Sequence, residues 1–199
     1  MDEATLNAYE RDAAGFAKEW NEQPSPLDMY DLLSRYFHPG PTADIGCGSG
    51  RDLAWLVSNG YDACGFDASP ALVRQARSVY DELDVREAAL PALEGVPRNF
   101  FENVLCETVI MHLDSQDVGL AVTNLFELVR PGGTLYLSWR VTENQSERDN
   151  RGRLYSAFDK QCVVDALSPD AVFLFDREDI SASSGKRVHR LVVRKMPAA

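Results

Sequence analysis

The chain has 199 residues, of which 45% are hydrophobic and 26% charged, a composition typical of one globular domain with a core of normal size. The formal net charge of −11 disfavours a nucleic-acid substrate, because an acidic surface repels phosphate groups. Four widely spaced cysteines form no CxxC pair and no Cys/His cluster, so we expect reduced thiols and no metal site. No secretory leader and no membrane-spanning apolar run is evident, so we expect a cytoplasmic location.

The first forty residues are predicted to be a helical extension or lid, followed by one globular unit over residues 41–199. Apolar residues recur at spacings of three and four, which predicts one amphipathic helix; they are Leu6, Tyr9, Ala13, Phe16, Ala17 and Trp20. The Pro24-Ser25-Pro26 segment should break this helix. A second helix is expected over residues 27–37.

From residue 42 onward, short apolar runs alternate with helical segments. The predicted strands are residues 42–45, 62–66, 85–87, 103–106 and 135–139. The predicted helices are residues 52–58, 70–83 and 117–129. Arg130-Pro131-Gly132-Gly133 should close the last of these helices. This alternation predicts an α/β fold, in which a mostly parallel sheet carries helices on both faces.

The end of the chain has a different pattern. A helix is expected over residues 155–166, and the polar segment 143–153 is expected to be a mobile surface loop. Two extended runs, residues 171–177 and 187–194, flank a glycine-containing turn. They predict a hairpin that makes the last strand antiparallel.

A glycine-rich turn follows the first predicted strand. Asp44-Ile45-Gly46-Cys47-Gly48-Ser49-Gly50 runs from a buried strand into a helix, as in a nucleotide-binding turn. Asp67 ends the second strand 17 residues after Gly50, where a carboxylate can accept hydrogen bonds from both ribose hydroxyls. Asp67 could alternatively cap the next helix or lie at the surface.

The spacing of the glycines separates two classes of ligand. A dinucleotide fingerprint would have glycine at position 51, but Arg51 occupies that position and Gly50 completes G-x-G-x-G. With this spacing, residues 40–195 resemble the class I (Rossmann-like) S-adenosylmethionine-dependent methyltransferases, including the Arg-Pro-Gly-Gly turn and the terminal hairpin. The resemblance implies a Rossmann-like seven-stranded sheet with an antiparallel last strand and an N-terminal helical lid.

The resemblance also implies where the cofactor, S-adenosylmethionine, would lie. Its methionine part would face Asp44 and the turn formed by Gly46, Cys47, Gly48 and Gly50. Asp67 would hold the ribose, and Ala68 and Ser69 would lie beside the adenine. The adenine amino group would be met by Glu87 or by the backbone of Ala88 and Ala89. Cys106 and Glu107 would lie near the sulfonium.

Several candidate residues keep two interpretations. Arg51 opposes the dipole of its helix, so it should pair with Asp52 or another acid, or with the carboxylate of the cofactor. His112 and Glu107 are the candidates for a catalytic base, which is needed if the acceptor must lose a proton, although His112 could simply pack locally. Cys106 is either a small buried residue or a nucleophile.

The same applies to the aromatic residues of the first helix and to the region after the fifth strand. Tyr9 and Trp20 could line the cofactor site from the lid or belong to the core. Trp139-Arg140 and the polar segment with Arg148, Arg151, Arg153 and then Tyr155 could contact the acceptor or could be solvated. Three arginines in six residues would suit an acidic small molecule.

We therefore expect a methyltransferase that acts on a small-molecule acceptor. The chain lacks the Asn/Asp-Pro-Pro-aromatic and Pro-Cys signatures that mark enzymes acting on nucleic-acid bases or glutamine amides. Two alternatives remain: an NAD(P)-binding oxidoreductase, and a non-catalytic binding module that keeps the cofactor fold.

Overall fold

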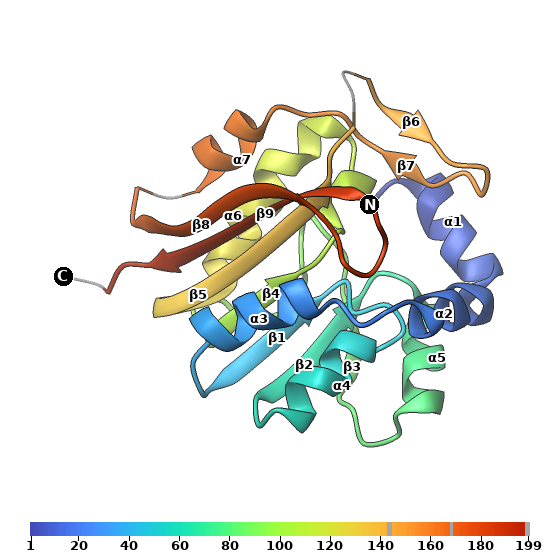
Figure 1. Cartoon of the computed structure of the whole chain (residues 1–199), viewed down its shortest axis with the longest axis horizontal. Coiled ribbons are helices and arrows are strands. Elements are labelled where there is room, and N and C mark those ends of the chain that lie inside the picture. The colour runs from blue at the N-terminus through green and yellow to red at the C-terminus, as the bar shows by residue number, and fades with distance from the viewer. Residues whose placement is uncertain (143–144, 168, 198–199) are drawn as a thin grey trace.

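The computed structural model describes residues 1–142, 145–167 and 169–197, and its centre is one seven-stranded sheet. The strand order is β3-β2-β1-β4-β5-β9-β8 (Figure 1). The strands are β1 Pro41–Ile45, β2 Asp62–Asp67, β3 Val85–Glu87, β4 Phe101–Cys106, β5 Val129–Arg140, β8 Ala171–Ile180 and β9 Arg187–Lys195. The first five pair in parallel, whereas β9 runs antiparallel between β5 and β8. This confirms the predicted fold class and the antiparallel last strand.

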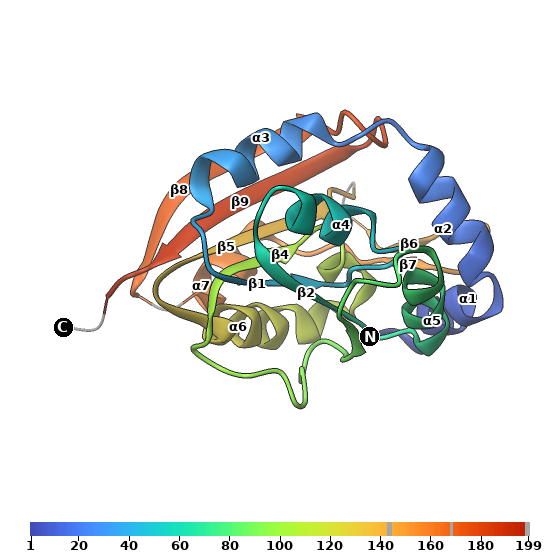
Figure 2. The ribbon, with the colours of Figure 1, turned by 90° about the horizontal axis from the view of Figure 1, so that it is seen from below.

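Helices cover both faces of the sheet (Figure 2). On one face lie α3 Leu27–Tyr36, α4 Arg51–Ser58 and α5 Pro70–Val79; on the other lie α6 Val118–Leu128 and α7 Lys160–Ala166. Every residue of β4 is buried, as expected for a central strand that is covered twice. Two short 3-10 turns, Ile110–His112 and Ser115–Asp117, connect β4 to α6.

The N-terminal segment contains two helices where the sequence predicted one. They are α1 Glu3–Arg11 and α2 Ala13–Glu22, separated at Asp12. The Asp12 backbone leaves the helical region (φ −140°, ψ 41°), and its carboxylate accepts a hydrogen bond from the Gly15 N–H at 3.2 Å. Because Asp12 caps a new helix, the amphipathic period continues while the helix axis turns. Helix α3 belongs to the core, since Met29 and Leu33 pack on the sheet.

The predicted end of one helix and the predicted start of another were wrong. Helix α5 ends at Val79, four residues before the predicted end at Leu83. Helix α7 begins at Lys160, because the Asp159 carboxylate caps it by accepting from the Gln161 N–H at 2.8 Å. The predicted start, Tyr155, belongs instead to a strand.

The segment predicted as a mobile loop contains one strand of a small two-stranded ladder, and the second strand follows it directly. The two strands are β6 Glu147–Arg148 and β7 Leu154–Tyr155. Residues 143–144 of the predicted loop lie outside the described residues. The Arg130–Gly133 turn also differs from the prediction, because it is an irregularity inside β5, where the register with β4 shifts. None of the described helices is both long and apolar enough to span a membrane.

Candidate functional site

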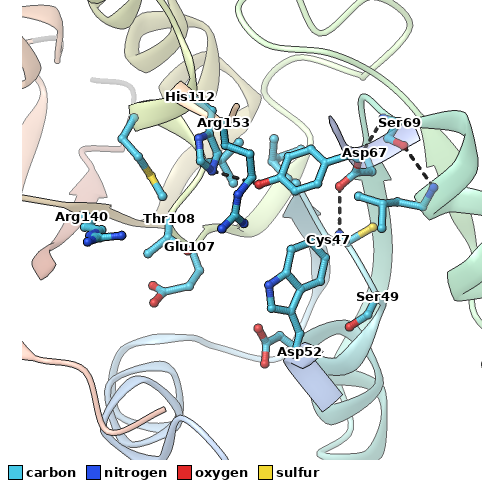
Figure 3. A pocket seen from close by; sticks show the side chains of 18 of the residues that line it. Cys47, Ser49, Asp52, Asp67, Ser69, Glu107, Thr108, His112, Arg140 and Arg153 are labelled. Carbon is cyan, nitrogen blue, oxygen red and sulfur yellow. Dashed lines mark hydrogen bonds between the residues drawn. The ribbon is translucent and has the colours of Figure 1, made fainter. Parts of the chain in front are cut away.

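A cavity of about 370 Å³ opens at the carboxyl ends of β1, β2, β4 and β5, where ligands bind in open parallel sheets. Helices α1 and α2 and the turn between β8 and β9 contribute to its walls. Figure 3 shows Asp67 and Ser69 toward one end of the cavity, and Glu107, Thr108 and Arg140 toward the other. One continuous space therefore joins the glycine turn to the end of β5.

The glycine turn packs closely against the ring of Trp20. Gly48 has φ +52°, and a Cβ at this position would lie 2.9 Å from the Trp20 ring. The Gly46 and Cys47 N–H groups both donate to the Phe66 carbonyl, at 2.7 and 3.1 Å. These two N–H groups are therefore not available to a ligand. What the glycines of the turn provide is a backbone that a ligand can approach closely.

Asp67 closes the turn from the end of β2. Its Oδ2 accepts from the Gly48 N–H at 2.9 Å, and its Oδ1 accepts from the Ser69 N–H at 2.9 Å. Burial raises the pKa of this carboxyl group, whereas the two backbone N–H groups act in the opposite direction. Each carboxylate oxygen has a second acceptor site, so the Asp67 side chain, which lines the cavity, can still bind two hydroxyl groups.

Asp44 lies behind the turn, completely buried. Its Oδ2 has no hydrogen-bond partner among the described residues. Burial, together with the nearby carboxylates of Asp52, Asp67 and Glu107, raises the pKa of Asp44 well above its usual value. A buried charged acceptor without a partner is costly, so this environment favours the protonated form of Asp44.

Arg51 pairs with its neighbour and contacts the lid. Its Nε donates to the Asp52 carboxylate at 3.0 Å, and its Nη1 donates to the Trp20 carbonyl at 2.9 Å. Asp52 also accepts from the Tyr30 hydroxyl at 2.8 Å. Of the two predicted interpretations, this structure contains the ion pair, and Arg51 thereby ties α2 to the start of α4.

Glu107 is the acidic residue at the other end of the cavity. The Ser138 hydroxyl on β5 donates to its Oε2, which fixes the carboxylate beside the end of β4. Burial raises the pKa of Glu107, opposed by Ser138 and by the charge of Arg190. The next residue, Thr108, has φ +54°, an unusual conformation for a residue with a side chain, and its N–H donates to Ser138 Oγ at 3.0 Å.

His112 is held by two hydrogen bonds. Its Nδ1 lies within hydrogen-bond distance of the Leu154 carbonyl, at 2.5 Å, and its Nε2 lies 3.0 Å from the Tyr9 hydroxyl. A carbonyl can only accept, so Nδ1 carries the proton and Nε2 accepts from Tyr9. Burial lowers the pKa of His112 to about 4 and raises that of Tyr9. His112 is therefore a neutral residue that orients Tyr9, and both residues line the cavity.

The three arginines of the β6–β7 region hold the N-terminal helices in place. Arg148 forms two hydrogen bonds of 2.8 Å with Asp2, and Arg151 pairs with Glu19 at 2.8 Å. Arg153 pairs with Asp149 at 2.7 Å and lies over the rings of three aromatic residues, Tyr9, Phe16 and Tyr155. Of the three, only Arg153 lines the cavity. Of the two interpretations of this segment, contact with an acceptor does not fit Arg148 and Arg151, which bind Asp2 and Glu19 of the N-terminal segment.

Most of the predicted site residues line the cavity. These are Tyr9, Trp20, Gly46, Cys47, Gly48, Arg51, Asp67, Ala68, Ser69, Ala88, Glu107 and His112. Four do not: Asp44, Gly50 and Cys106 lie behind the wall, and Ala89 faces a separate shallow hollow that also contains Glu87. Burial raises the pKa of the Cys106 thiol well above its usual value, which argues against a nucleophilic role.

Sequence reasoning missed one wall of the cavity altogether. The β8–β9 turn contributes Ser181, Ser183, Ser184 and Lys186. Its glycine and serine content predicted a turn, but nothing local showed which residues it would face. Glu10 was also missed: its carboxylate accepts from the Ser69 hydroxyl at 2.5 Å and from the Ala71 N–H at 3.0 Å, which joins α1 to the start of α5.

Comparison with known proteins connects this site to one family. Residues 43–137 match the family model described as a methyltransferase domain. Glycine N-methyltransferase from Rattus norvegicus is 30% identical over 114 residues, which cover 49% of this chain and 39% of that protein. The probable S-adenosyl-L-methionine-dependent methyltransferase TehB from Haemophilus influenzae is 25% identical over 134 residues, 66% of this chain and 46% of that protein. The chain thus spans less than half the length of these two relatives.

Solved structures show the same fold over nearly the whole chain. The 1,6-didemethyltoxoflavin-N1-methyltransferase of Burkholderia thailandensis superposes with a TM-score of 0.71 at 18% identity, covering 97% of this chain and 88% of that one. The N-methyltransferase NodS of Bradyrhizobium japonicum gives a TM-score of 0.71 at 18% identity, with 97% and 99% covered. Residues 43–137 thus match a methyltransferase domain, and the chain has the same fold as these two methyltransferases.

Proposed function

We propose that the protein transfers the methyl group of S-adenosylmethionine to a small-molecule acceptor bound beside the ends of β4 and β5. The observation that carries this proposal is the continuity of the cavity, which runs from Asp67 and the glycine turn to Glu107 and Arg140. Donor and acceptor could therefore lie in one enclosed space, as a direct transfer requires. The names of the relatives include methyltransferases of small molecules, which agrees with the volume of the cavity.

The residues around the glycine turn fit the cofactor. Asp67 has free acceptor positions for the ribose hydroxyls, and Gly46, Cys47 and Gly48 line the cavity beside it. Ala68, Ala88 and Leu90 form an apolar edge suited to the adenine. When bound, S-adenosylmethionine supplies a methyl group on a positively charged sulfur, which reacts with a lone pair that approaches in line.

Glu107 is the better placed of the two candidate bases. Burial raises the pKa of its carboxyl group toward neutrality, where a base is most effective, whereas the lowered pKa of His112 makes that imidazole a weak base. Glu107 would accept the proton of an acceptor that must lose one as it is methylated. His112 is a positioning residue. Its Nε2 accepts a hydrogen bond from the Tyr9 hydroxyl, which turns the lone pairs of the Tyr9 oxygen away from His112 and toward the cavity.

The N-terminal helices would keep water out during transfer. Trp20 covers the glycine turn, and the pairs Arg148–Asp2 and Arg151–Glu19 hold these helices closed. Excluding water preserves the orientation of the reactants and protects the donor. All four cysteines are free, which fits the reducing cytoplasm in which we place the reaction.

Calorimetric titration and methyl transfer together test this function. We expect S-adenosylhomocysteine to bind and NAD to give no heat, and labelled S-adenosylmethionine to yield labelled small molecules from a cell extract. Binding of NAD without binding of S-adenosylhomocysteine would instead support an oxidoreductase. Cofactor binding without product from any extract would support a non-catalytic module.

A further inference from the structure

We propose that the methyl acceptor carries a carboxylate or phosphate group, which binds to a cationic wall formed by Arg140, Lys186 and three serines of the β8–β9 turn, Ser181, Ser183 and Ser184. All five residues line the cavity. The inference rests on the proposed function, because it names the class of acceptor for that same site.

The strand register brings the two cations to one cavity. Arg140 pairs with Val188 across the β5–β9 ladder, and the Val141 N–H donates to the Arg187 carbonyl at 3.1 Å. Lys186 lies just before β9, where its carbonyl accepts from the Ser181 N–H at 2.9 Å, and it lines the same cavity as Val188 and Arg140. The wall is therefore a consequence of the antiparallel last strand.

Within the part of the chain that the structure describes, these two cations differ from Arg51 and Arg153 in having no acidic partner. Arg51 pairs with Asp52, and Arg153 pairs with Asp149. Across residues 1–142, 145–167 and 169–197, no carboxylate lies within ion-pair distance of Arg140 or Lys186.

The Arg140 guanidinium instead lies 4.7 Å from the centre of the Tyr155 ring. A guanidinium has five N–H donors, so Arg140, which lines the cavity, can contact Tyr155 and still bind an anion. In a chain of net charge −11, two cations on one cavity wall that have no acid within ion-pair distance among the described residues indicate an anionic ligand.

The serine turn is held in position by the rest of the protein. The Ala182 N–H donates to Asp28 Oδ2 at 3.0 Å, and the Ser183 hydroxyl lies 3.2 Å from Gln23 Oε1. The same Asp28 oxygen accepts from buried Arg190 at 2.7 Å. Both views of the ribbon show this turn beside the linker between α2 and α3 (Figures 1 and 2). The hydroxyl groups are therefore part of a built wall.

Glu107 determines how the acceptor is oriented in the cavity. It is bound to Ser138, which precedes Arg140 by two residues on the same face of β5. The Glu107 carboxylate repels an anion, so the anionic group of the acceptor binds toward Lys186. The atom to be methylated then points toward Glu107, where a proton acceptor is available.

The test uses the full chain, labelled S-adenosylmethionine and a small-molecule cell extract divided into three parts. One part stays untreated, one has its carboxylates capped by carbodiimide coupling to an amine, and one is treated with phosphatase. We expect labelled product from the untreated part and its loss after one of the two treatments, which identifies the anion as carboxylate or phosphate. Label that survives both treatments would overturn the anionic acceptor and leave the methyltransferase function intact.

Variants connect this result to the wall. Arg140→Gln and Lys186→Gln should each raise the acceptor KM by about tenfold or more, because each removes a charge-assisted hydrogen bond, and Arg140→Lys should restore part of the loss at position 140. Affinity for S-adenosylhomocysteine should stay unchanged in all of them. Arg177→Gln, on the exposed side of β8, is the matched control.

The variants also separate failure of the inference from failure of the function. An unchanged KM in both glutamine variants would refute the wall. If the untreated extract gives no labelled product although the cofactor binds, the methyltransferase function fails, and the proposed acceptor class fails with it.

Discussion

Replacing Asp67 with asparagine, a side chain of the same shape, tests the proposed cofactor site. A carboxylate binds two ribose hydroxyls through charge-assisted hydrogen bonds of about 1.5–3 kcal/mol each, against about 0.5–1.5 kcal/mol for neutral bonds. The expected loss is about 2–3 kcal/mol, which corresponds to binding that is about 30- to 150-fold weaker. Titration of S-adenosylhomocysteine by calorimetry measures it directly.

The same substitution also acts on the turn itself. An amide has only one oxygen, so either the Gly48 or the Ser69 N–H loses its acceptor, which should lower the free energy of unfolding by about 1–3 kcal/mol. Asp62→Asn, at the exposed opposite end of β2, is the matched control and should change neither quantity. If Asp67→Asn bound S-adenosylhomocysteine as tightly as the unaltered protein does, Asp67 would not hold the ribose.

Two further predictions concern the glycine turn and the buried histidine. Gly48→Ala should weaken binding of S-adenosylhomocysteine, because the added Cβ would displace the Trp20 ring that packs on the glycine turn. Gly60→Ala, with φ +86° and nothing within 4 Å, should cost only the backbone strain of about 1–2 kcal/mol and leave binding intact. Equal binding by the two variants would refute the contact. Burial lowers the pKa of His112 to about 4. Between pH 4 and about pH 6.5 the unfolded chain therefore binds a proton that the folded chain does not. The free energy of unfolding should fall with falling pH across this range, by up to about 3 kcal/mol. Urea unfolding of His112→Gln should show a flatter pH dependence than that of the exposed-site control His38→Gln, and identical slopes would contradict the assignment.

The sheet and the glycine turn could be predicted because their determinants are local. Buried strands such as Phe101–Cys106 are short apolar runs bounded by turn residues, and the order of glycines distinguishes Gly50 from a dinucleotide fingerprint. The break at Asp12 was also encoded locally, as an aspartate three residues before Gly15, but the continuous apolar spacing concealed it. Periodicity reports which face is buried, and it does not report whether the helix axis turns.

The lid contacts and the acceptor wall could not be predicted, because their partners are far apart in the sequence. Arg148 lies 146 residues from Asp2, so a count of arginines suggested an anionic ligand where the fold supplies acids of its own. The conformation of Thr108 had no local marker either, since threonine seldom adopts a positive φ. Lys186 becomes a cavity residue only through the pairing of β9 with β5.

The hairpin formed by β8 and β9 separates the two tasks proposed for the cavity. The proposed donor half is built from a continuous stretch around β1 and β2, whereas the opposite wall comes from a turn more than a hundred residues later. Substitutions or insertions in that turn can alter the shape and charge of the far wall without touching the glycine loop. A graft of this single hairpin tip between related chains is therefore a compact way to exchange substrate preference while the donor stays the same.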